Sequence, residues 1–443
     1  MEVDLLTDVK RRGLVSQISS PELLGQLLRE KQTVYMGIDP TAPALHVGHL
    51  LPLMCLMHFH VRGHTVHPVI GGATGLVGDP SGRAKARDRD SLANERIEGN
   101  ARRLADSMGV FFRKGLEYAE GRWKQEGPTI GSPEVLNNLE WTRDLSLLEF
   151  LRTVGVHARM NTMLGRESVK LRLSSEEGMS YTEFSYQLLQ AYDFYTLFRK
   201  RGCRIQIGGS DQWGNILAGQ DLIGRLAGPD QAVVCLTTPL FTTSSGEKFG
   251  KSAGNAVWLD DSMTSPFDFY QFFTRTTDED VPKLLKMLTL LPMETIDASL
   301  NEHKNTPERR VAQHLLADEV TEMIHGVDGL RQAHAATKAL FAKDYTGIKA
   351  ADVIAALRGD PRLVFSSGSD LFAKPLARLA HEHRLVPSMS AARQLVSSKG
   401  FYVNNKRVEE VGFTLRHSDL LDGRLAIVRA GKGNHLIIAL SEH

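Results

Sequence analysis

Residues 35–49 read YMGIDPTAPALHVGH, and this stretch decides the predicted fold. The apolar run Thr33–Ile38 leads into a turn with two prolines, and a helical pattern begins near Gly48. Together they predict a strand, a turn and then a helix. His46 and His49 stand three residues apart where that helix starts. Because a helix start presents free N–H groups and partial positive charge, it is a place where phosphate binds.

The two histidines have other interpretations. A zinc site would need further ligands, and the sequence has neither an HExxH motif nor a CxxC pair. We therefore expect no metal at this motif. Two structural histidines remain the alternative when the motif is taken alone. Gly48 between them would let a flat base approach the backbone closely, which suits a nucleotide.

Similar strand-like runs occur further along the chain, at His64–Ile70, Arg204–Ile207 and Ala232–Leu236. Each ends near Gly, Pro or Asp, and helical patterns separate them. This alternation predicts an α/β fold with a parallel sheet. We assign residues 1–264 to this domain.

The rest of the chain has a different sequence pattern. Residues 265–358 carry apolar positions at helical spacing and predict a helical domain. Residues 359–373 hold Gly, Pro and three Ser, which predicts a linker. Residues 374–443 predict a small module of helices and short strands, with eleven Lys and Arg against six Asp and Glu. This basic excess suits a nucleic-acid surface, with a solvated basic face as the alternative.

Composition excludes several classes of protein. Of the 443 residues, 42% are hydrophobic and 24% are charged, which allows a large core and argues against global disorder. No segment reaches the ~20 apolar residues of a membrane span, and the best candidate, Leu50–Val61, contains two histidines. Cys55, Cys203 and Cys235 form no CxxC pair, which predicts core thiols in a reducing compartment. The first residues show no signal or transit peptide.

Two glycine-rich turns follow predicted strands. In residues 70–87, Asp79 lies within a close-packed turn, and Arg83 and Arg87 follow it as candidates to face a polyphosphate. Residues 206–214 read QIGGSDQWG, in which Asp211 is placed to bind ribose hydroxyls at the carboxyl end of a strand. A plain structural turn is the alternative in both cases.

The stretch Thr182–Lys200 predicts a helix with one polar stripe. Tyr186, Gln190 and Asp193 fall at i, i+4 and i+7, which places them on one face. The other faces are mostly apolar, so we expect the stripe to line a cavity rather than bulk water. A solvated face would be expected to carry lysine and glutamate instead. Thr182 is the expected cap of this helix.

Residues 246–252 read GEKFGKS. The segment is similar to a Walker phosphate loop, but it lacks the spacing that the Walker motif requires between its two glycines. We interpret it as a mobile loop that brings Lys248 and Lys251 to a polyphosphate. An ordinary solvated loop is the alternative.

Taken together, these five motifs resemble those of class I tyrosyl-tRNA synthetases. HVGH at 46–49 resembles the HIGH signature, and KFGKS at 248–252 resembles the KMSKS signature. The stretches 183–193 and 206–213 resemble the tyrosine-specific helix and strand. The resemblance covers nearly the whole chain and is closest in texture to fungal mitochondrial members. It implies a Rossmann-type catalytic domain with an inserted connecting segment, a helical anticodon-binding domain and a small α+β RNA-binding module.

The resemblance also implies an activity and partners. The expected reaction activates L-tyrosine with ATP and Mg²⁺ to tyrosyl-adenylate and then transfers tyrosine to the 3' end of tRNA(Tyr). No tightly bound cofactor, zinc or membrane is expected, and members of the family are homodimers. The alternative is an RNA-binding cofactor for splicing group I introns, as a second activity or in place of catalysis. The expected location is the mitochondrial matrix, with the bacterial cytoplasm as the alternative.

The site residues that the resemblance implies fall into three groups. Tyrosine would be bound by Tyr35, Asp79, Tyr186, Gln190, Asp193 and Gln206. ATP would be bound by Gly37, Asp39, Gly48, Gly209, Asp211, Gln212, Lys248, Phe249, Lys251 and Ser252. Catalysis would rest on Thr41, His46, His49, Arg83, Arg87, Lys248 and Lys251.

Overall fold

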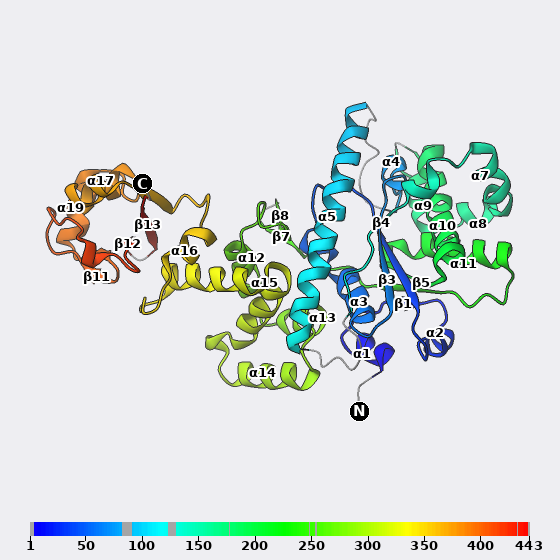
Figure 1. The fold of residues 1–443 in the computed structure, drawn as a ribbon, viewed down its shortest axis with the longest axis horizontal. Coiled ribbons are helices and arrows are strands. Elements are labelled where there is room, and N and C mark those ends of the chain that lie inside the picture. The colour runs from blue at the N-terminus through cyan, green and yellow to red at the C-terminus, as the bar shows by residue number, and fades with distance from the viewer. Residues whose placement is uncertain are drawn as a thin grey trace. The chain divides into compact units, whose positions relative to one another are not determined.

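The computed structural model describes residues 4–81, 91–122, 130–176, 178–247, 249–252, 255–431 and 433–441 (Figure 1). Its contacts divide the chain into two units, which are described separately. The first comprises Met1–Asp260 and Phe273–Ile324, and the second comprises Asp261–Phe272 and His325–His443.

Six strands form the main sheet of the first unit, in the order β1-β6-β5-β2-β3-β4. Their bounds are β1 Gln17–Ile18, β2 Thr33–Ile38, β3 Thr65–Ile70, β4 Leu136–Asn137, β5 Cys203–Gly209 and β6 Val234–Thr238. All neighbours pair in parallel except β1, which runs antiparallel to β6. The predicted α/β fold is confirmed, and the four predicted strands correspond to β2, β3, β5 and β6.

The order of this sheet changes direction between β2 and β5. From β2 the chain continues to β3 on one side and later returns to β5 on the other. At such a switch point the loops diverge, and ligands of open α/β sheets bind beyond the carboxyl ends of the strands. Asp39 follows β2, Gly71 follows β3 and Gly209 ends β5, so three of the motif loops meet at this edge.

The helix after β2 begins with a single 3-10 turn at Val47–His49 and continues as α3, Leu50–His60. Every residue of α3 except Pro52 is buried. A helix that is apolar all round belongs in a core, and this one is contacted by β2, β3 and β5. Among the described residues, no helix is long and apolar enough to cross a membrane.

Helix α10, Tyr181–Arg201, carries the predicted polar stripe and packs along α11, Trp213–Ala227. Ser180 caps α10, because its hydroxyl accepts the N–H of Glu183 while the Glu183 carboxylate accepts the N–H of Ser180. The prediction that Thr182 caps this helix is therefore wrong. A capping box with serine and glutamate three residues apart competes better for the free N–H groups than a lone threonine.

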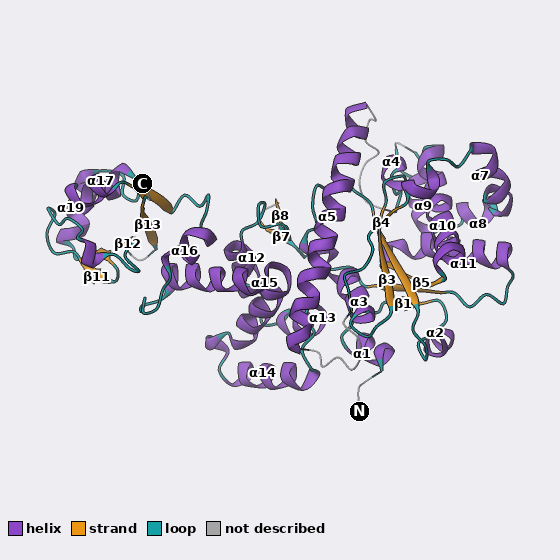
Figure 2. Ribbon diagram, in the orientation of Figure 1, coloured by secondary structure: helices purple, strands orange, loops and turns teal. Residues whose placement is uncertain are grey.

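The other helices complete the first unit and are visible in Figure 2. They are α1 Leu5–Arg11, α2 Pro21–Leu27, α4 Thr74–Val77, α5 Ser91–Arg122, α6 Leu139–Thr142, α7 Leu147–Thr153, α8 Met160–Leu164, α9 Glu167–Leu173, α13 Val281–Leu288 and α14 Met293–Asn305. The short helices α6 to α9 occupy the chain between β4 and α10. Helices α12, Pro266–Thr274, and α15, Val311–Phe341, have residues in both units.

The second unit is built around a five-stranded sheet in the order β11-β10-β12-β13-β9. Its elements are α16 Ala350–Ala356, β9 Leu363–Ser366, α17 Gly368–Ala373, α18 Leu376–Glu382, α19 Met389–Ser397, β10 Phe401–Val403, β11 Lys406–Arg407, β12 Leu425–Ala430 and β13 Asn434–Leu440. Successive residues of β12 and β13 point to opposite faces. One face packs with α17 to α19 and the other with α16 and the end of α15, so the sheet is buried on both sides.

The segment 359–373 is not the linker that the sequence predicted. Residues Leu363–Ser366, three of them apolar, form β9, which pairs in parallel with β13. The hydroxyl of Ser367 accepts the N–H of Asp370 and caps α17. Of the residues that indicated a loop, Ser366 ends β9, Ser367 caps α17 and Gly368 begins it, so composition alone misled the prediction. The other predicted domain boundaries remain predictions.

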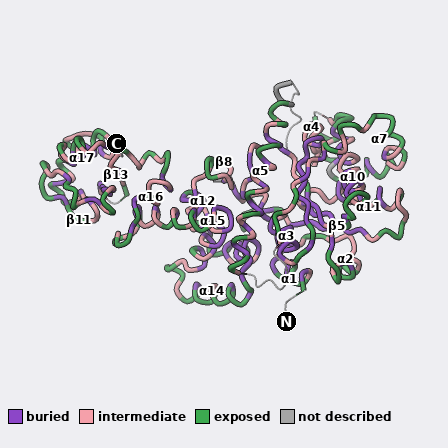
Figure 3. The backbone as a smooth tube through the Cα atoms, in the orientation of Figure 1, coloured by how far each residue is buried: buried purple, intermediate pink, exposed green. Residues whose placement is uncertain are grey.

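The core follows the main sheet and the helices against it, as the buried stretches in Figure 3 show. Cys55, Cys203 and Cys235 are all buried, which confirms the prediction of core thiols. Burial raises the pKa of each of these thiols, because a thiolate in apolar surroundings loses its hydration. They therefore pack as small hydrophobic residues.

Candidate active site

The site begins where neighbouring parallel strands set two polar side chains side by side. Tyr35 of β2 pairs in register with Gln206 of β5. Both side chains are 2% exposed. The Tyr35 ring packs on Phe194 of α10, with centroids 5.4 Å apart. The sheet and α10 therefore surround the polar groups of Tyr35 and Gln206 with apolar side chains. We call this region the polar end of the site.

Three buried polar atoms of this region lack a hydrogen-bond partner among the described residues. They are the hydroxyl of Tyr35 and the side-chain oxygens of Gln190 and Gln206. An unpaired buried polar atom costs free energy, roughly 1–3 kcal/mol each. Such atoms are therefore expected where a ligand completes them.

Asp193 lies at the same end of the site and is held by two donors. The Nδ2 atom of Asn138 donates to its carboxylate at 3.0 Å, and the indole N–H of Trp141 donates at 2.7 Å. Burial still raises the pKa of Asp193 to about 7, since the two hydrogen bonds only partly offset the lost hydration. Burial raises the pKa of Tyr35, and the nearby Asp193 carboxylate raises it further, which places the two groups in each other's field.

The sequence reasoning missed Asn138 and Trp141. Both follow the short strand β4, which pairs with the end of β3. The available signal was Leu136 followed by two asparagines, which is an apolar residue ending in polar ones at the carboxyl edge of a parallel sheet. Two strand residues are too few for periodicity to reveal.

Asp39 joins the loop after β2 to α4 and α10. Its carboxylate accepts the hydroxyl of Thr74 at 2.7 Å and the hydroxyl of Tyr186 at 2.8 Å. Burial raises the pKa of Asp39 to about 6, with a further contribution from the nearby Asp79 carboxylate. A Cβ added at Gly71 would lie 1.9 Å from Oδ1 of Asp39, so only glycine fits there. Asp39, predicted to bind ATP, thus also orients Tyr186.

The Asp79 carboxylate accepts hydrogen bonds from side-chain amides that follow β5. The Nε2 atom of Gln212 donates to it at 2.5 Å and the Nδ2 atom of Asn215 at 3.2 Å, while Ser81 donates from its backbone N–H and its hydroxyl. Asp211 is exposed beside Gln212, whose Nε2 lies 3.5 Å from its carboxylate. The predicted tyrosine-binding Asp79 and the predicted ATP-binding Gln212 are therefore brought together.

His46 and His49 form a stacked pair at the start of α3, with ring centroids 3.9 Å apart. The Nδ1 atom of His46 accepts the N–H of Gly48, and the Nδ1 atom of His49 accepts the N–H of His46. A neutral ring with Nδ1 accepting carries its proton on Nε2. Burial and the neighbouring His46 lower the pKa of His49 to about 3, so His49 is neutral near pH 7. The neutral His49 ring thus carries an N–H at Nε2.

Two backbone hydrogen bonds attach the predicted KFGKS loop to the histidine motif. Val47 donates its N–H to the carbonyl of Val257 at 2.9 Å, and Val257 donates to the carbonyl of Gly250 at 2.9 Å. Gly250 has a φ of +91°, and a Cβ there would lie 3.2 Å from the N atom of Gly48. Phe249, predicted to contact ATP, packs its ring on Phe241 at 4.6 Å. The two signatures are therefore neighbours in space.

Arg83, Arg87 and Lys248 lie outside the described residues, and Lys251 and Ser252 are described only as the short strand β7. Gly37 and Thr41 are exposed at the end of β2 and in the loop that follows. Within the described part of the chain, no cluster of three or more His, Cys, Asp or Glu is arranged to hold a metal ion.

Comparison with known proteins gives matches over both units. The family described as "tRNA synthetases class I (W and Y)" matches residues 28–342. The family described as "Tyrosine--tRNA ligase SYY-like C-terminal domain" matches residues 369–438.

Similar proteins come from bacteria and from mitochondria. The tyrosine–tRNA ligase of Geobacillus stearothermophilus is 41% identical over 438 residues, covering 98% of this chain and 99% of that protein. The human mitochondrial tyrosine–tRNA ligase is 41% identical over 452 residues, covering 98% of this chain and 91% of that protein. The crystal structure of a truncated mitochondrial tyrosyl-tRNA synthetase from Aspergillus nidulans is 37% identical with a TM-score of 0.69, covering 77% of this chain and 95% of that one.

The raised pKa of Asp193 predicts a pH-dependent contribution to stability. A carboxyl group with pKa 3.8 unfolded and about 7 folded binds more protons when folded between those values. Its contribution to the free energy of unfolding therefore falls as pH rises, by about 1.4 kcal/mol per pH unit within that window. Asp193→Asn removes this slope. We expect the free energy of unfolding of the wild type minus that of the variant, measured by urea denaturation across the window, to decrease with rising pH.

Asp144→Asn is the matched control, because Asp144 is exposed. Its difference from wild type should stay flat across the same pH range. A flat difference for Asp193→Asn as well would contradict a buried carboxyl group with a raised pKa.

Proposed function

The chain belongs to the class I tRNA synthetases, among the tyrosine–tRNA ligases, and from that membership we propose how its site works. The enzyme joins L-tyrosine to tRNA with ATP as the second substrate. The observation that carries the assignment of the tyrosine pocket is the enclosed polar end beside Asp193, where Tyr35 and Gln206 keep unpaired polar atoms. A phenol hydroxyl entering that end would donate to Asp193 and accept from Tyr35.

The chemistry needs neither a general base nor a covalent enzyme intermediate. The tyrosine carboxylate is already a nucleophile, attacks the α-phosphorus of ATP in line and displaces pyrophosphate. The terminal ribose hydroxyl of tRNA then attacks the carbonyl of the adenylate and releases AMP. Such a site acts through positioning and through donors aimed at the charge that develops on phosphate. Mg²⁺ enters with ATP and neutralises part of that charge.

The tyrosine ammonium group is assigned to the acidic and amide side of the pocket. Asp79 and Gln190 would receive it, together with the hydroxyl of Tyr186, whose orientation is set by the hydrogen bond to Asp39. This assignment is consistent with the unpaired buried oxygen of Gln190. The Asp79 carboxylate, already paired with Gln212, would couple the ammonium end to the nucleotide end.

The nucleotide is assigned to the start of α3 and the loop after β5. His46 and His49 would donate from Nε2 to the phosphates, which is consistent with their Nδ1 atoms being occupied by backbone N–H groups. Asp211 and the backbone at Gly209 would take the ribose. The roles of Arg83, Arg87, Lys248 and Lys251 at the leaving pyrophosphate are proposed from sequence motifs alone.

The names of the relatives describe ligases and do not support the alternative of a splicing cofactor. The basic C-terminal module is instead proposed to bind tRNA. It matches a family described as a C-terminal domain of tyrosine–tRNA ligases. Lys399, Lys406 and Arg407 are exposed on and next to the β10–β11 hairpin.

A homodimer is proposed from exposed apolar side chains on the segment that leads from α7 into the first residue of α10. Large apolar residues there are strongly exposed, at fractions from 55% to 74%: Leu147, Leu148, Val156, Met160, Leu171 and Tyr181. Exposed apolar side chains concentrated in one segment are typical of an interface with another protein. We assign the face to a second copy of the chain, because family members act as homodimers.

We further propose that the enzyme works in the mitochondrial matrix. Mitochondrial ligases of fly and human are 40% and 41% identical to it, and a fungal mitochondrial structure shares its catalytic fold. The bacterial cytoplasm is the alternative, since bacterial relatives are 41% identical. Detection of the protein in a matrix fraction of its source cells supports the first location, and its detection only in a bacterial cytosol overturns it.

Amino-acid-dependent exchange of pyrophosphate into ATP tests the pocket. We expect exchange with tyrosine and none with phenylalanine or tryptophan. Tyrosyl enzymes are themselves the standard example of such discrimination, which reaches about 10⁵-fold against phenylalanine. Tyr35→Phe removes one neutral hydrogen bond to the phenol and should lower kcat/KM for tyrosine by about 3- to 10-fold.

Tyr192→Phe is the control, because Tyr192 lies on α10 but packs in a separate apolar cluster. Its kinetics should match wild type. Equal losses in both variants would contradict the assignment of Tyr35, and exchange with phenylalanine at the rate of tyrosine would contradict the pocket.

Leu148→Asp should convert a dimer into a monomer. The substitution places a charge at a side chain that is 73% exposed in the single chain and would be buried against the second copy. Light scattering after size exclusion should give twice the chain mass for wild type and the chain mass for the variant. Val327→Asp, at a side chain that is 68% exposed in the second unit, should stay dimeric. A dimeric Leu148→Asp protein would refute this interface.

Replacing Lys399, Lys406 and Arg407 together by glutamine should raise KM for tRNA in aminoacylation. If each cation meets one phosphate, the dependence of binding on salt should weaken by about two to three units of logarithmic slope. Exchange of pyrophosphate needs no RNA and should remain unchanged. An unchanged KM for tRNA, or an equal loss of both activities, would contradict a role for this surface in tRNA binding.

A further inference from the structure

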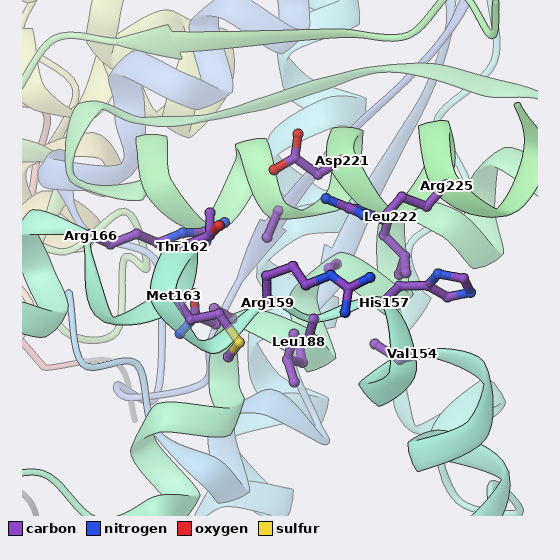
Figure 4. A pocket seen from close by; sticks show the side chains of 14 residues that line it. Val154, His157, Arg159, Thr162, Met163, Arg166, Leu188, Asp221, Leu222 and Arg225 are labelled. Carbon is purple, nitrogen blue, oxygen red and sulfur yellow. The ribbon is translucent and has the colours of Figure 1, made fainter. Parts of the chain in front are cut away.

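A second concavity lies in the first unit, away from the residues assigned to tyrosine. It is enclosed by the segment from α7 to α9 on one side and by α10 and α11 on the other (Figure 4). Its empty volume is about 440 Å³, including the part that is open to solvent. The established reaction assigns nothing to this pocket.

The pocket lies against a different face of α10 from the tyrosine stripe. Gln187, Leu188 and Ala191 line it, and they interleave in sequence with Tyr186 and Gln190 of the stripe. At 100° per residue, the middle of this set lies roughly 150° around the helix from the stripe. The floor is completed by apolar side chains from the facing helices, namely Val154, Met163, Ala218 and Leu222.

The polar side chains around the pocket are mainly cationic. Arg159, Arg166 and Arg225 line it, with Asp221 as the single carboxylate. Within the described residues, none of these three guanidinium groups makes an ion pair within 4.0 Å. In Figure 4, Arg159 and Arg166 approach from the α8–α9 side and Arg225 from α11. Three arginines line the pocket against one carboxylate, Asp221, whose charge acts on Arg166, so a local excess of positive charge remains.

Two polar atoms at the pocket are buried and lack a partner in the described part of the chain. They are Nη1 of Arg166, a donor, and Oε1 of Gln187, an acceptor. Gln187 is only 2% exposed, and its Nε2 already donates to the carbonyl of Phe184 at 3.2 Å. Leaving a buried guanidinium N–H unpaired costs more than leaving a neutral group unpaired. The buried N–H of Arg166 therefore needs a hydrogen-bond acceptor, and Oε1 of Gln187 can accept a hydrogen bond from a hydroxyl group.

From these observations we propose that the pocket binds a small oxyanion carried by a phosphate or carboxylate group. Arg166 would donate from its buried N–H, Arg159 and Arg225 would add charge at the entrance, and Gln187 would accept a proton of a protonated oxygen. A cation is excluded by the arginines. The apolar floor of Leu188, Ala191 and Leu222 would take a short apolar portion of an ester.

The position of Arg166 links this pocket to the nucleotide end of the site. A Cβ added at Gly214 would lie 3.5 Å from Cδ of Arg166, so the aliphatic part of this arginine lies against the first turn of α11. Gln212 and Asp211 immediately precede that turn. An anion that orders Arg166 would therefore restrain the helix start that follows the proposed ribose-binding loop. This coupling rests on the proposed function, whereas binding of the anion does not.

Calorimetric titration of the full-length enzyme with inorganic phosphate at low ionic strength tests the inference. We expect Arg166→Gln to weaken binding by about 10- to 100-fold, as for loss of a hydrogen bond to a charged group. Arg152→Gln is the matched control, since Arg152 is an exposed residue of α7 that does not line the pocket. It removes the same charge and should leave binding unchanged. Phosphate held at the proposed pyrophosphate site would remain in both variants and can be subtracted.

Two further variants guard against a folding defect in Arg166→Gln. Arg225→Gln changes an exposed side chain of α11 and should also weaken binding. Ala218→Leu fills the floor and should abolish the binding of phenyl phosphate. Tighter binding of phenyl phosphate than of inorganic phosphate identifies a phosphomonoester, equal binding identifies free phosphate, and tighter binding of benzoate identifies a carboxylate. No binding to wild type, or equal losses in Arg166→Gln and Arg152→Gln, overturns the proposal.

The coupling is read separately, from the dissociation constant for ATP with and without phenyl phosphate. A change that disappears in Arg166→Gln supports the coupling. An unchanged constant together with intact binding of phenyl phosphate overturns the coupling alone, and absence of any ATP binding would instead overturn the proposed function.

Discussion

The constraint on which the site depends is the burial of the Asp193 carboxylate beneath a parallel sheet. An ion removed from water must be given donors or become protonated, and the fold supplies Asn138 and Trp141. Those donors are in place only because β4 adds to the edge of β3, which carries the chain past α10. The short strand β4 therefore matters for the chemistry of the site. It delivers two N–H groups to a carboxylate, and a pKa of about 7 shows that they balance the lost hydration only in part.

The proposed nucleotide end also depends on placed hydrogen-bond donors, but there the negative charge comes with the substrate rather than from the protein. In the proposed function this end receives a polyphosphate, so donors rather than acceptors are needed there. Backbone N–H groups occupy the Nδ1 atoms of His46 and His49, which fixes the orientation of both rings. The backbone connection through Val257 then holds the glycine of the second signature against the first. Glycine is required at Gly250, because a side chain would meet the α3 entry and the φ is positive.

Sequence reasoning succeeded where the periodicity or the motif was long. The sequence predicts the strand Thr33–Ile38 with its bounds, since a mostly apolar run of six residues that leads into a proline-containing turn leaves little ambiguity. It failed at short elements whose existence depends on tertiary pairing. The strand Leu363–Ser366 was taken for a linker, and the donors Asn138 and Trp141 were missed after a two-residue strand. Such contacts connect residues more than fifty positions apart, which no local pattern records.

Helix α10 shows why the two pockets are physically related. An α-helix repeats every 3.6 residues, so a buried helix offers a different set of side chains to each neighbour. One face of α10 holds the tyrosine stripe, and another, with Gln187 and Ala191, faces the arginine-lined pocket. Close packing transmits small shifts between faces of a rigid helix, because interiors have few voids to absorb them. In the proposed coupling, a ligand that changes the position of Arg166 would act on the first turn of α11, against which this arginine lies, without touching either substrate.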